Sequence, residues 1–389
     1  MQEHVTTDVV QAFESFLNRK FDLEKGPMWF VRYIKVTENN DKTPAVDSKD
    51  KSRFVLLFGF HHNFTDGTSN VKFCDVFLKV FNDVMLERAT DMKVEARFAE
   101  PFHDRLSVRM KEEDPVLSNM YLMYHFCKRF YKGVLLFGRS VHNFTKHYHQ
   151  QPTEEPETRI IPGELNEEIT AKLVAKCKQE KVTLNSAFTA ASNIALYKMI
   201  LAKDPSIKRT DFSGIQTVNA RRYWSEDSRV DSIGCHITTL DISIPMDRND
   251  LVHVWEYVRN VQATIKHELD VSKKGVRLLA ISRGLRIFLA VNSFMNWAGV
   301  APVNANHFCI TNMGDITKSF SGEGEAVQCT KVLRSVSAHF MNNLCQHTIH
   351  TFRGKLYHIF DYYVQKMTKA NAETYAKLTL KTLQEFLEL

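Results

Sequence analysis

The chain has 389 residues, of which 44% are hydrophobic and 25% are charged, with a formal net charge of +6. This length exceeds that of one ordinary domain, so we expect two domains or subdomains. The positive charge is spread along the chain without a dense basic run, which excludes nucleic acid as an expected partner but suits an anionic, phosphorylated co-substrate.

The seven cysteines are widely spaced and form no C-x-x-C pair. This spacing argues against a disulfide framework and against a structural zinc site, and it favours a reducing compartment. The amino terminus has no apolar signal-peptide core, and no uncharged apolar run approaches the roughly 20 residues of a membrane span. We therefore expect a cytoplasmic protein without a transmembrane segment.

The first part of the chain, residues 1–147, is predicted to contain short strands and helices. A short helix is expected at Val9–Leu17, followed by strands at Met28–Val36 and Arg53–Phe60. A longer helix is expected at Thr68–Leu86, because its apolar residues recur at the i, i+3, i+4 and i+7 spacing of an amphipathic helix.

An aromatic and basic segment at 116–142 precedes the most linker-like stretch of the sequence. The segment is interpreted as a helix packed on the body of the protein with its cations extended to solvent, and peripheral membrane contact is the alternative. The stretch at 148–157 is polar and marked by proline, so it is predicted to be a linker. It separates an N-terminal subdomain, 1–147, from a C-terminal subdomain, 158–389.

The second part of the chain alternates predicted strands and helices, which favours mixed α/β layers. A strand at 159–162 leads to a helix with Asn166 as its cap, and an Ala-rich helix with Asn185 as its cap follows. Further strands are expected at 211–218, 232–244, 306–312, 330–340 and 354–363, and further helices near 251–269 and 370–387.

The sequence HHNFTDG occupies positions 61–67, between the second predicted strand and the amphipathic helix. Because strand side chains alternate between faces, His62 is expected to end the face that Phe58 and Phe60 share. Gly67 belongs to an Asp-Gly turn and could adopt a positive φ there. An imidazole at such a junction can accept a proton at neutral pH, yet a histidine at a strand end is more often an ordinary polar residue. Spacing alone leaves this choice open.

HHxxxDG between a strand and a helix resembles the signature of the CoA-dependent acyltransferase superfamily, which includes chloramphenicol acetyltransferase, alcohol acetyltransferases, wax ester synthases and condensation domains. Further segments resemble superfamily elements in the same order and extend the resemblance over nearly the whole chain. They are Phe21–Trp29 ("FDL..GPLW"), Thr183–Phe188 ("TLND"), Val218–Arg221 ("VN.R"), Ile233–Leu240 ("IG.F.NTL"), Ile310–Gly314 ("SNLG") and the closing element from Arg353.

The resemblance implies an α/β fold of two chloramphenicol-acetyltransferase-like subdomains, with mixed sheets flanked by helices and an active-site tunnel between them. It implies an acyltransferase that moves an acyl group from a thioester, in the first place acyl-CoA, to an alcohol. N-acyl transfer, condensation-type amide formation, or a relative that only binds a ligand or partner are the alternatives. Acyl-CoA would be a co-substrate, no cofactor would stay bound, and a monomer is expected.

The resemblance also assigns roles to individual residues. His62 would be the general base that takes a proton from the acceptor, whereas His61, Asp66 and Gly67 would shape the loop. A metal site is not expected, since adjacent strand residues face opposite ways and only one histidine could join Asp66. Contacts across the tunnel are expected from the following residues: Asn312, Thr311, Gly314 and Asn219.

The superfamily's arginine-bearing "RH..LR" segment, which precedes the "FDL..GPLW" element, has no counterpart here. In condensation domains this segment supplies the arginine that pairs with the motif aspartate, so Asp66 is expected to lack its usual partner. Arg32, on the strand before the motif, is the substitute that we predict for that role.

Overall fold

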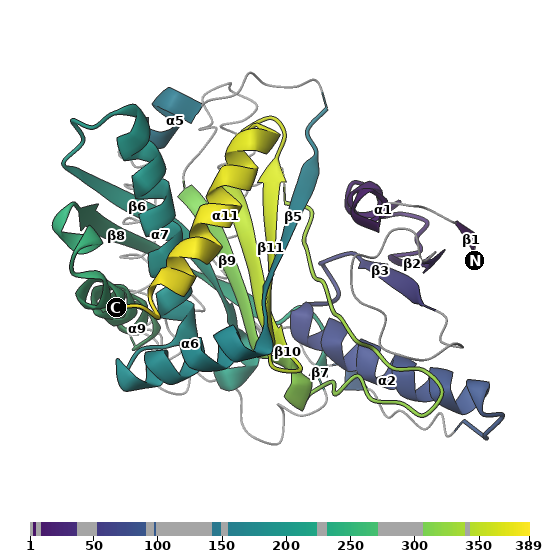
Figure 1. Cartoon of the computed structure of the whole chain (residues 1–389). Coiled ribbons are helices and arrows are strands. Elements are labelled where there is room, and N and C mark those ends of the chain that lie inside the picture. Colours follow the sequence, from purple (N-terminus) through teal and green to yellow (C-terminus); the bar gives the residue numbers. More distant parts are fainter. Residues whose placement is uncertain are drawn as a thin grey trace, which may run out of the picture.

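The structure is a computed structural model that describes residues 3–4, 9–36, 53–90, 97–98, 142–148, 155–223, 232–270, 306–338 and 343–389. The aromatic and basic segment at 116–142, apart from its last residue, lies outside the described residues, as do residues 149–154 of the expected linker. Figure 1 shows a large sheet with helices on one face and a smaller sheet beside it.

The smaller sheet has three strands in the order β1–β2–β3. β1 (Glu3–His4) pairs in parallel with β2 (Trp29–Lys35), which pairs antiparallel with β3 (Phe54–Phe60). The two longer strands are confirmed to within one residue at each end, because both are short apolar runs bounded by polar loops.

Two helices belong to this part of the protein. α1 (Val9–Leu17) covers the smaller sheet and buries Ala12 and Phe16 in a small cluster with residues of β2 and β3. α2 (Gly67–Met85) starts directly after the HHxxxDG loop and extends away from the large sheet (Figure 1). Both helices follow the predicted apolar periodicity, so their positions are confirmed.

The large sheet has six strands in the order β5–β11–β10–β9–β6–β8. β9 pairs in parallel with both β10 and β6, whereas the other neighbours are antiparallel, so the sheet is mixed. Its strands are β5 (Thr158–Leu165), β6 (Arg209–Asn219), β8 (Ile237–Asp247), β9 (Asn306–Asp315), β10 (Asn343–Phe352) and β11 (Lys355–Tyr363). A separate parallel ladder joins β4 (Arg97–Phe98) to β7 (Ser232–Ile233).

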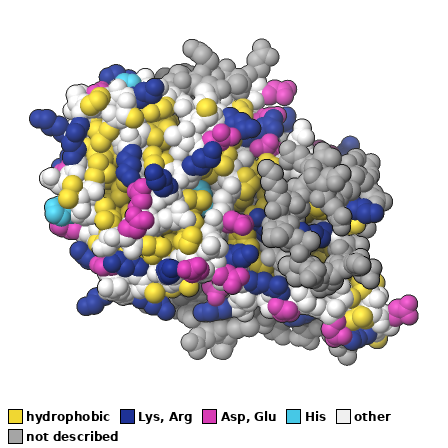
Figure 2. All heavy atoms as spheres, viewed as in Figure 1, with side chains coloured by type: hydrophobic (Ala, Val, Ile, Leu, Met, Phe, Trp, Pro, Cys, Tyr) yellow, Lys and Arg dark blue, Asp and Glu magenta, His cyan; other side chains and the backbone are white. Residues whose placement is uncertain are grey.

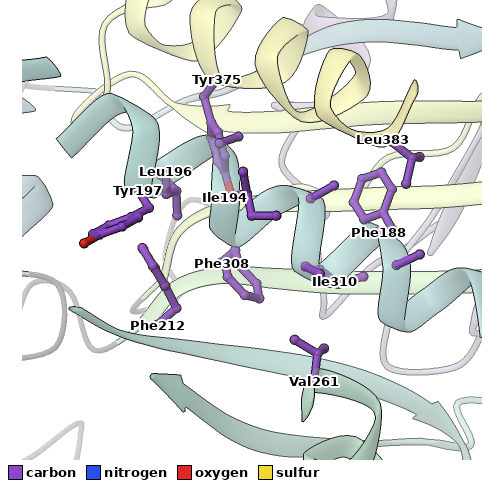
Figure 3. Packing of buried hydrophobic residues seen from close by; sticks show 14 of the residues in the cluster. Phe188, Ile194, Leu196, Tyr197, Phe212, Val261, Phe308, Ile310, Tyr375 and Leu383 are labelled. Carbon is purple, nitrogen blue, oxygen red and sulfur yellow. The ribbon is translucent and has the colours of Figure 1, made fainter. Parts of the chain in front are cut away.

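Helices pack on one face of the large sheet and form the main core with it (Figure 3). Side chains of α7 such as Phe188 and Ile194 lie against Phe308 of β9 and Tyr375 of the C-terminal helix. The helices are α5 (His142–Tyr148), α6 (Glu167–Gln179), α7 (Leu184–Lys203), α9 (Val254–Asp270) and α11 (Lys369–Glu385), with 3₁₀ turns at Ala220–Tyr223, Asn249–Leu251 and Ile316–Lys318.

The sequence predicts the N-terminal cap of α6 correctly but not that of α7. Asn166 caps α6 as expected, because its side chain accepts a hydrogen bond from the Ile169 amide at 2.8 Å. The cap predicted at Asn185 is wrong. Thr183 caps α7 by accepting from the Ser186 amide, and Asn185 lies inside the first turn.

The strand predicted at 330–340 is also wrong for its described part, since residues 330–338 are irregular. They belong to a long segment, 316–338, that runs along α2 and packs Val327, Val332 and Leu333 against it (Figure 1). The strand that enters the large sheet is β10, which begins at Asn343. Val332 and Leu333 therefore supply helix contacts and not sheet pairing.

The mixed α/β architecture agrees with the predicted fold class. No helix within the described ranges is long and apolar enough to cross a membrane. On the face shown in Figure 2, Lys and Arg side chains are interspersed with Asp and Glu. The charge of this face is therefore mixed, as the even spread of charge along the sequence predicts.

Candidate active site

The HHxxxDG loop connects β3 to α2. The pairing of β2 with β3 continues one residue beyond the strand, since the His61 amide donates to the Met28 carbonyl at 2.9 Å. The chain then turns, and α2 begins at Gly67. The loop is thus fixed at both ends by regular structure, which limits how far its side chains can move.

Asp66 is the most constrained side chain of the loop and is almost fully buried. Oδ1 accepts from the Ser69 amide at 3.0 Å and caps α2, while Oδ2 accepts from Arg221 Nη1 at 2.7 Å and from the His236 amide at 2.8 Å. Burial alone would raise the pKa of this carboxyl, but the hydrogen bond and charge of Arg221, with the two amides, hold it below its ordinary value. Asp66 is therefore an ionised anchor that joins three segments of the chain.

Arg221 extends this anchor to the start of α2. Its Nη2 donates to Ser69 Oγ at 3.0 Å and to the Gly234 carbonyl at 3.1 Å. Ser69 Oγ also accepts from the Gly234 amide at 3.1 Å. The start of α2 is consequently tied to the end of β6 and to the segment between β7 and β8.

The prediction that Arg32 pairs with Asp66 is wrong. Arg32 lies on β2, donates to Ser15 Oγ at 3.1 Å and lies 5.3 Å from the centroid of the Phe16 ring. Its guanidinium is directed at α1, whereas Asp66 is directed at Arg221. The arginine that pairs with Asp66 is Arg221 of the "VN.R" segment.

The two histidines of the motif diverge. His61 packs edge-on against Phe21, with ring centroids 5.3 Å apart, and its Nδ1 accepts from the Asn63 amide at 3.3 Å. His62 is exposed, and its Nδ1 lies 3.6 Å from the sulfur of Cys235. Among the residues that the structure describes, Nε2 of His62 has no hydrogen-bond partner. His62 is therefore the histidine that can meet a substrate.

Cys235 lies between Gly234 and His236, both of which are bonded to the Asp66 network. Burial raises the pKa of the Cys235 thiol to about 11, and the nearby charge of Asp66 adds to this effect. The sulfur beside His62 is therefore a neutral thiol at physiological pH. The strand predicted at 232–244 breaks here into β7 and β8, and the break brings Cys235 to the histidine.

Gly67 does not have the positive φ that the turn chemistry would allow, and a side chain here would meet two neighbouring side chains. It is the first residue of α2 and has no left-handed backbone. A Cβ atom at this position would lie 2.4 Å from Nη2 of Arg334 and 2.8 Å from the sulfur of Met313. The guanidinium of Arg334 thus lies against the motif glycine.

Arg334 is a member of the site that the sequence did not single out. Its Nη1 is buried without a hydrogen-bond partner among the described residues. Burial lowers the pKa of this guanidinium to about 10, while the charges of Asp66 and Asp361 act in the opposite direction. The irregular segment that carries Arg334 has no motif-like pattern, so only the three-dimensional structure reveals it.

Asn219 lies close to the loop and holds it from the large sheet. Its side-chain Nδ2 donates to Thr68 Oγ1 at 3.2 Å, and its Oδ1 accepts from the backbone amide of Arg221 at 3.0 Å. These bonds orient Arg221 and the first turn of α2. The Asn219 side chain therefore serves to position the loop, and a substrate contact from it stays a prediction.

The three residues predicted on β9 lie at its carboxyl end. Asn312 donates to Asn185 Oδ1 of α7 at 3.2 Å and accepts from the Gly314 amide at 2.8 Å, so its side chain is directed at a helix. Thr311 lies beside Thr348 of β10 in the parallel register. Gly314 has φ of +67°, with open space where a Cβ would be, so backbone conformation explains it. Substrate contacts from these residues stay predictions.

Among the described residues, no group of three or more His, Cys, Asp or Glu side chains could hold a metal ion. The tunnel between two subdomains and the boundaries at 147 and 158 stay predictions.

Solved structures with low sequence identity share this fold. Trichothecene 15-O-acetyltransferase from Fusarium sporotrichioides is 16% identical with a TM-score of 0.63, over 93% of this chain and 71% of that one. The condensation domain of the monacolin K polyketide synthase is 12% identical with a TM-score of 0.60, over 99% and 78%. The epimerization domain from the third module of tyrocidine synthetase B is 12% identical with a TM-score of 0.55, over 98% and 77%.

In sequence, no curated protein matches the chain. The profile of a protein family does match, over residues 2–280, and its description is alcohol acetyltransferase. This range contains the HHxxxDG loop, the Arg221 segment and Cys235. Since the match covers more than half of the chain, the protein is an acyltransferase that belongs to the alcohol acetyltransferase family.

Proposed function

We propose that the protein transfers an acyl group from acyl-CoA to an alcohol and that His62 is the general base. The observation that carries this proposal is that Asp66 and His62 have different surroundings within the motif. Asp66 uses both carboxylate oxygens on Ser69, Arg221 and His236, and none on the imidazole. His62 is exposed and keeps its Nε2 available for a substrate proton.

In the proposed reaction Nε2 of His62 takes the hydroxyl proton of the alcohol as the oxygen attacks the thioester carbonyl. The tetrahedral intermediate then collapses, the carbon–sulfur bond breaks, and CoA leaves as a thiolate that receives the proton from the imidazolium. The products are an ester and CoA thiol, and His62 is neutral again. No covalent acyl-enzyme is needed, because both substrates react directly.

The choice of donor rests on chemistry and charge. A thioester is an activated acyl group, and an alcohol can attack its carbonyl once a base has taken the hydroxyl proton. CoA also carries several negatively charged phosphate groups. The protein's net charge of +6 favours such an anionic co-substrate. The family match favours an alcohol as the acceptor.

The Asp66–Arg221 pair favours an active enzyme over a relative that only binds ligand. The loop that carries His62 has its buried anchor within the chain, and this anchor involves side chains with 6% and 0% exposure. The fixed position of this loop supports the proposed role of His62, whose side chain is exposed on it.

The test is thiol release from a panel of acyl-CoAs with alcohols and amines as acceptors. His62→Ala and His62→Gln should lower kcat by about 10²–10⁴-fold, with unchanged circular dichroism. His253→Ala is the matched control, since this exposed histidine lies at the start of α9 and outside the site. Equal turnover by wild type and His62→Ala would refute the proposal, and acylation of amines alone would replace the alcohol with an amine acceptor.

A further inference from the structure

Cys235 is the side chain that touches the imidazole of His62. Its sulfur lies 3.6 Å from Nδ1, within the range of a weak hydrogen bond to sulfur.

The backbone on both sides of Cys235 is fixed by the loop that carries His62. The Gly234 amide and carbonyl are both bonded to Ser69 Oγ, at 3.1 and 3.0 Å, and the His236 amide donates to Asp66 Oδ2 at 2.8 Å. A contiguous set of bonds therefore runs from Asp66 to Cys235 and from Cys235 to His62. Asp66 does not touch the histidine, yet it determines where the sulfur beside it lies.

A cysteine next to a histidine can form either of two pairs. In a thiolate–imidazolium pair the histidine is already protonated and cannot act as a base. In a neutral pair one of the two ring nitrogens keeps its lone pair. Burial and the charge of Asp66 raise the pKa of the thiol to about 11, so the pair here is neutral.

We propose that Cys235 is a positioning residue for His62: its sulfur accepts a hydrogen bond from Nδ1–H, which keeps the ring in place and leaves the lone pair on Nε2, where the alcohol loses its proton. This inference rests on the proposed role of His62 as base. It gives the motif aspartate an indirect function in catalysis through the segment Gly234–His236. Once Nε2 has accepted the proton, the same sulfur also helps to hold the imidazolium.

The test compares Cys235→Ala and Cys235→Ser with wild type in steady-state kinetics between pH 5 and pH 9. Cys235→Ala should lower kcat by about tenfold, a smaller loss than that of the base itself, with little change in the KM for acyl-CoA. Its kcat–pH profile should differ from that of wild type, because Nδ1–H of His62 no longer has the sulfur as its acceptor. Cys235→Ser should retain most of the activity and the wild-type profile, since a hydroxyl accepts the same hydrogen bond.

Cys329→Ala is the matched control, because Cys329 is also half-buried with a thiol pKa raised by burial, but it lies in the segment along α2. Its kinetics should equal those of wild type. A second readout is the ¹⁵N spectrum of His62, assigned by its loss in His62→Gln. The signal of the Nδ1–H tautomer should dominate in wild type and weaken in Cys235→Ala.

Two results would overturn the proposal. If Cys235→Ala has the kcat, pH profile and His62 tautomer of wild type, the sulfur only fills space. A loss of turnover in His62→Ala would show that the proposed function still holds in that case. An acyl group found on Cys235 by mass spectrometry after incubation with acyl-CoA alone, and transferred on addition of alcohol, would make Cys235 a covalent carrier. In that step the cysteine sulfur gains the acyl carbon and CoA leaves as a thiol.

Discussion

Asp66 and Arg221 form an ion pair whose side chains are 0% and 6% exposed. Withdrawing two charges from water is costly, so such a pair persists only where further hydrogen bonds complete it. Here Ser69 and His236 supply amides to the carboxylate, and Ser69 Oγ and the Gly234 carbonyl accept from the guanidinium. The pair therefore specifies one position of the loop and is not simply a source of stability.

Removal of one partner should be far more harmful than removal of both. Asp66→Asn leaves the Arg221 charge buried without its counter-ion, and we expect a loss of about 3–5 kcal/mol in the free energy of unfolding. The double variant Asp66→Asn with Arg221→Met should lose less than the sum of the single losses. Urea unfolding at pH 7 measures both, and additive losses would contradict the assigned pairing.

The same pair gives the unfolding free energy a predictable pH dependence. The pKa of Asp66 is lower in the folded protein than its ordinary value of 3.8, so its contribution is complete above that value. The contribution is lost as the pH falls through the lowered folded pKa. The stability difference between wild type and Asp66→Asn should thus be constant from pH 7 to pH 5 and shrink below about pH 4. A difference that stays constant to pH 2 would contradict this assignment.

Gly67 and Arg334 predict a steric effect at the same loop. In Gly67→Ala the new methyl group would meet Nη2 of Arg334 at 2.4 Å, so the guanidinium or the helix start must shift. We expect a loss of about 1–3 kcal/mol and a lower kcat. Arg334→Ala in the Gly67→Ala background should recover part of the stability that Gly67→Ala loses, as thermal unfolding of the three variants would reveal. If Gly67→Ala is as stable and active as wild type, the close approach of Arg334 is not maintained in solution.

At the level of single residues, the sequence identified the motif but not the partner of its aspartate. His62 and Asp66 were identifiable because they belong to a compact motif at a strand–helix junction. Arg221 was visible as part of "VN.R", but its pairing across 155 positions depends on how two sheets meet. Arg32 was the wrong choice because proximity along the chain does not determine which side of a strand faces the loop.

α2 links the candidate site to the segment 316–338. Ser69 in its first turn is bonded to Arg221 and Gly234, and the segment that carries Arg334 packs along the helix (Figure 1). Asn82 of α2 makes several of the hydrogen bonds that hold this segment. Its oxygen accepts from the amides of Ala326 and Val327, and its amide group donates to the Val327 and Leu78 carbonyls.

Asn82→Ala should release the segment from α2. Four hydrogen bonds are lost, and the part-buried amides of Ala326 and Val327 lose their acceptor, so we expect a loss of about 1–3 kcal/mol in the free energy of unfolding. Hydrogen exchange of residues 322–330 should accelerate, while that of β10 should not change. Arg88→Ala is the control, since its pair with Glu325 links the same elements at the surface and an exposed pair contributes little. Equal exchange in wild type and Asn82→Ala would rule out this role of Asn82.

The elements themselves were predictable where one periodicity dominates. The apolar spacing of α1 and α2 and the short apolar run of β3 fix their positions to within one or two residues. β10 has no such pattern, because nine of its ten residues are buried and several of them are polar, such as Gln346, His347 and His350. Residues 330–338 look more strand-like than β10 does, and only their packing on α2 decides their conformation.

At the level of the whole molecule, the two sheets have very different cores. The large sheet shares a continuous cluster with α6, α7, α9 and α11 (Figure 3), and α5 joins it through Phe144 and Tyr148. Under the smaller sheet, the buried cluster within the described residues consists of Ala12, Phe16, Ile34 and Leu57. Polar contacts join this part of the protein to the large sheet, including the bonds of Asn18, which directly follows α1, to both backbone groups of Thr158 on β5.

This asymmetry predicts that the smaller sheet opens without unfolding of the whole protein. A three-stranded sheet with few buried side chains gains little from packing, so its opening free energy should lie well below the global value. Native-state hydrogen exchange should therefore show the amides of β2 and β3 exchanging about 100-fold faster than those of β10 and β11. The start of α2 should be intermediate, because Asp66 and Asn219 tie it to the large sheet. Equal protection of both sheets would instead mean that the polar contacts across the site make the molecule unfold as one unit.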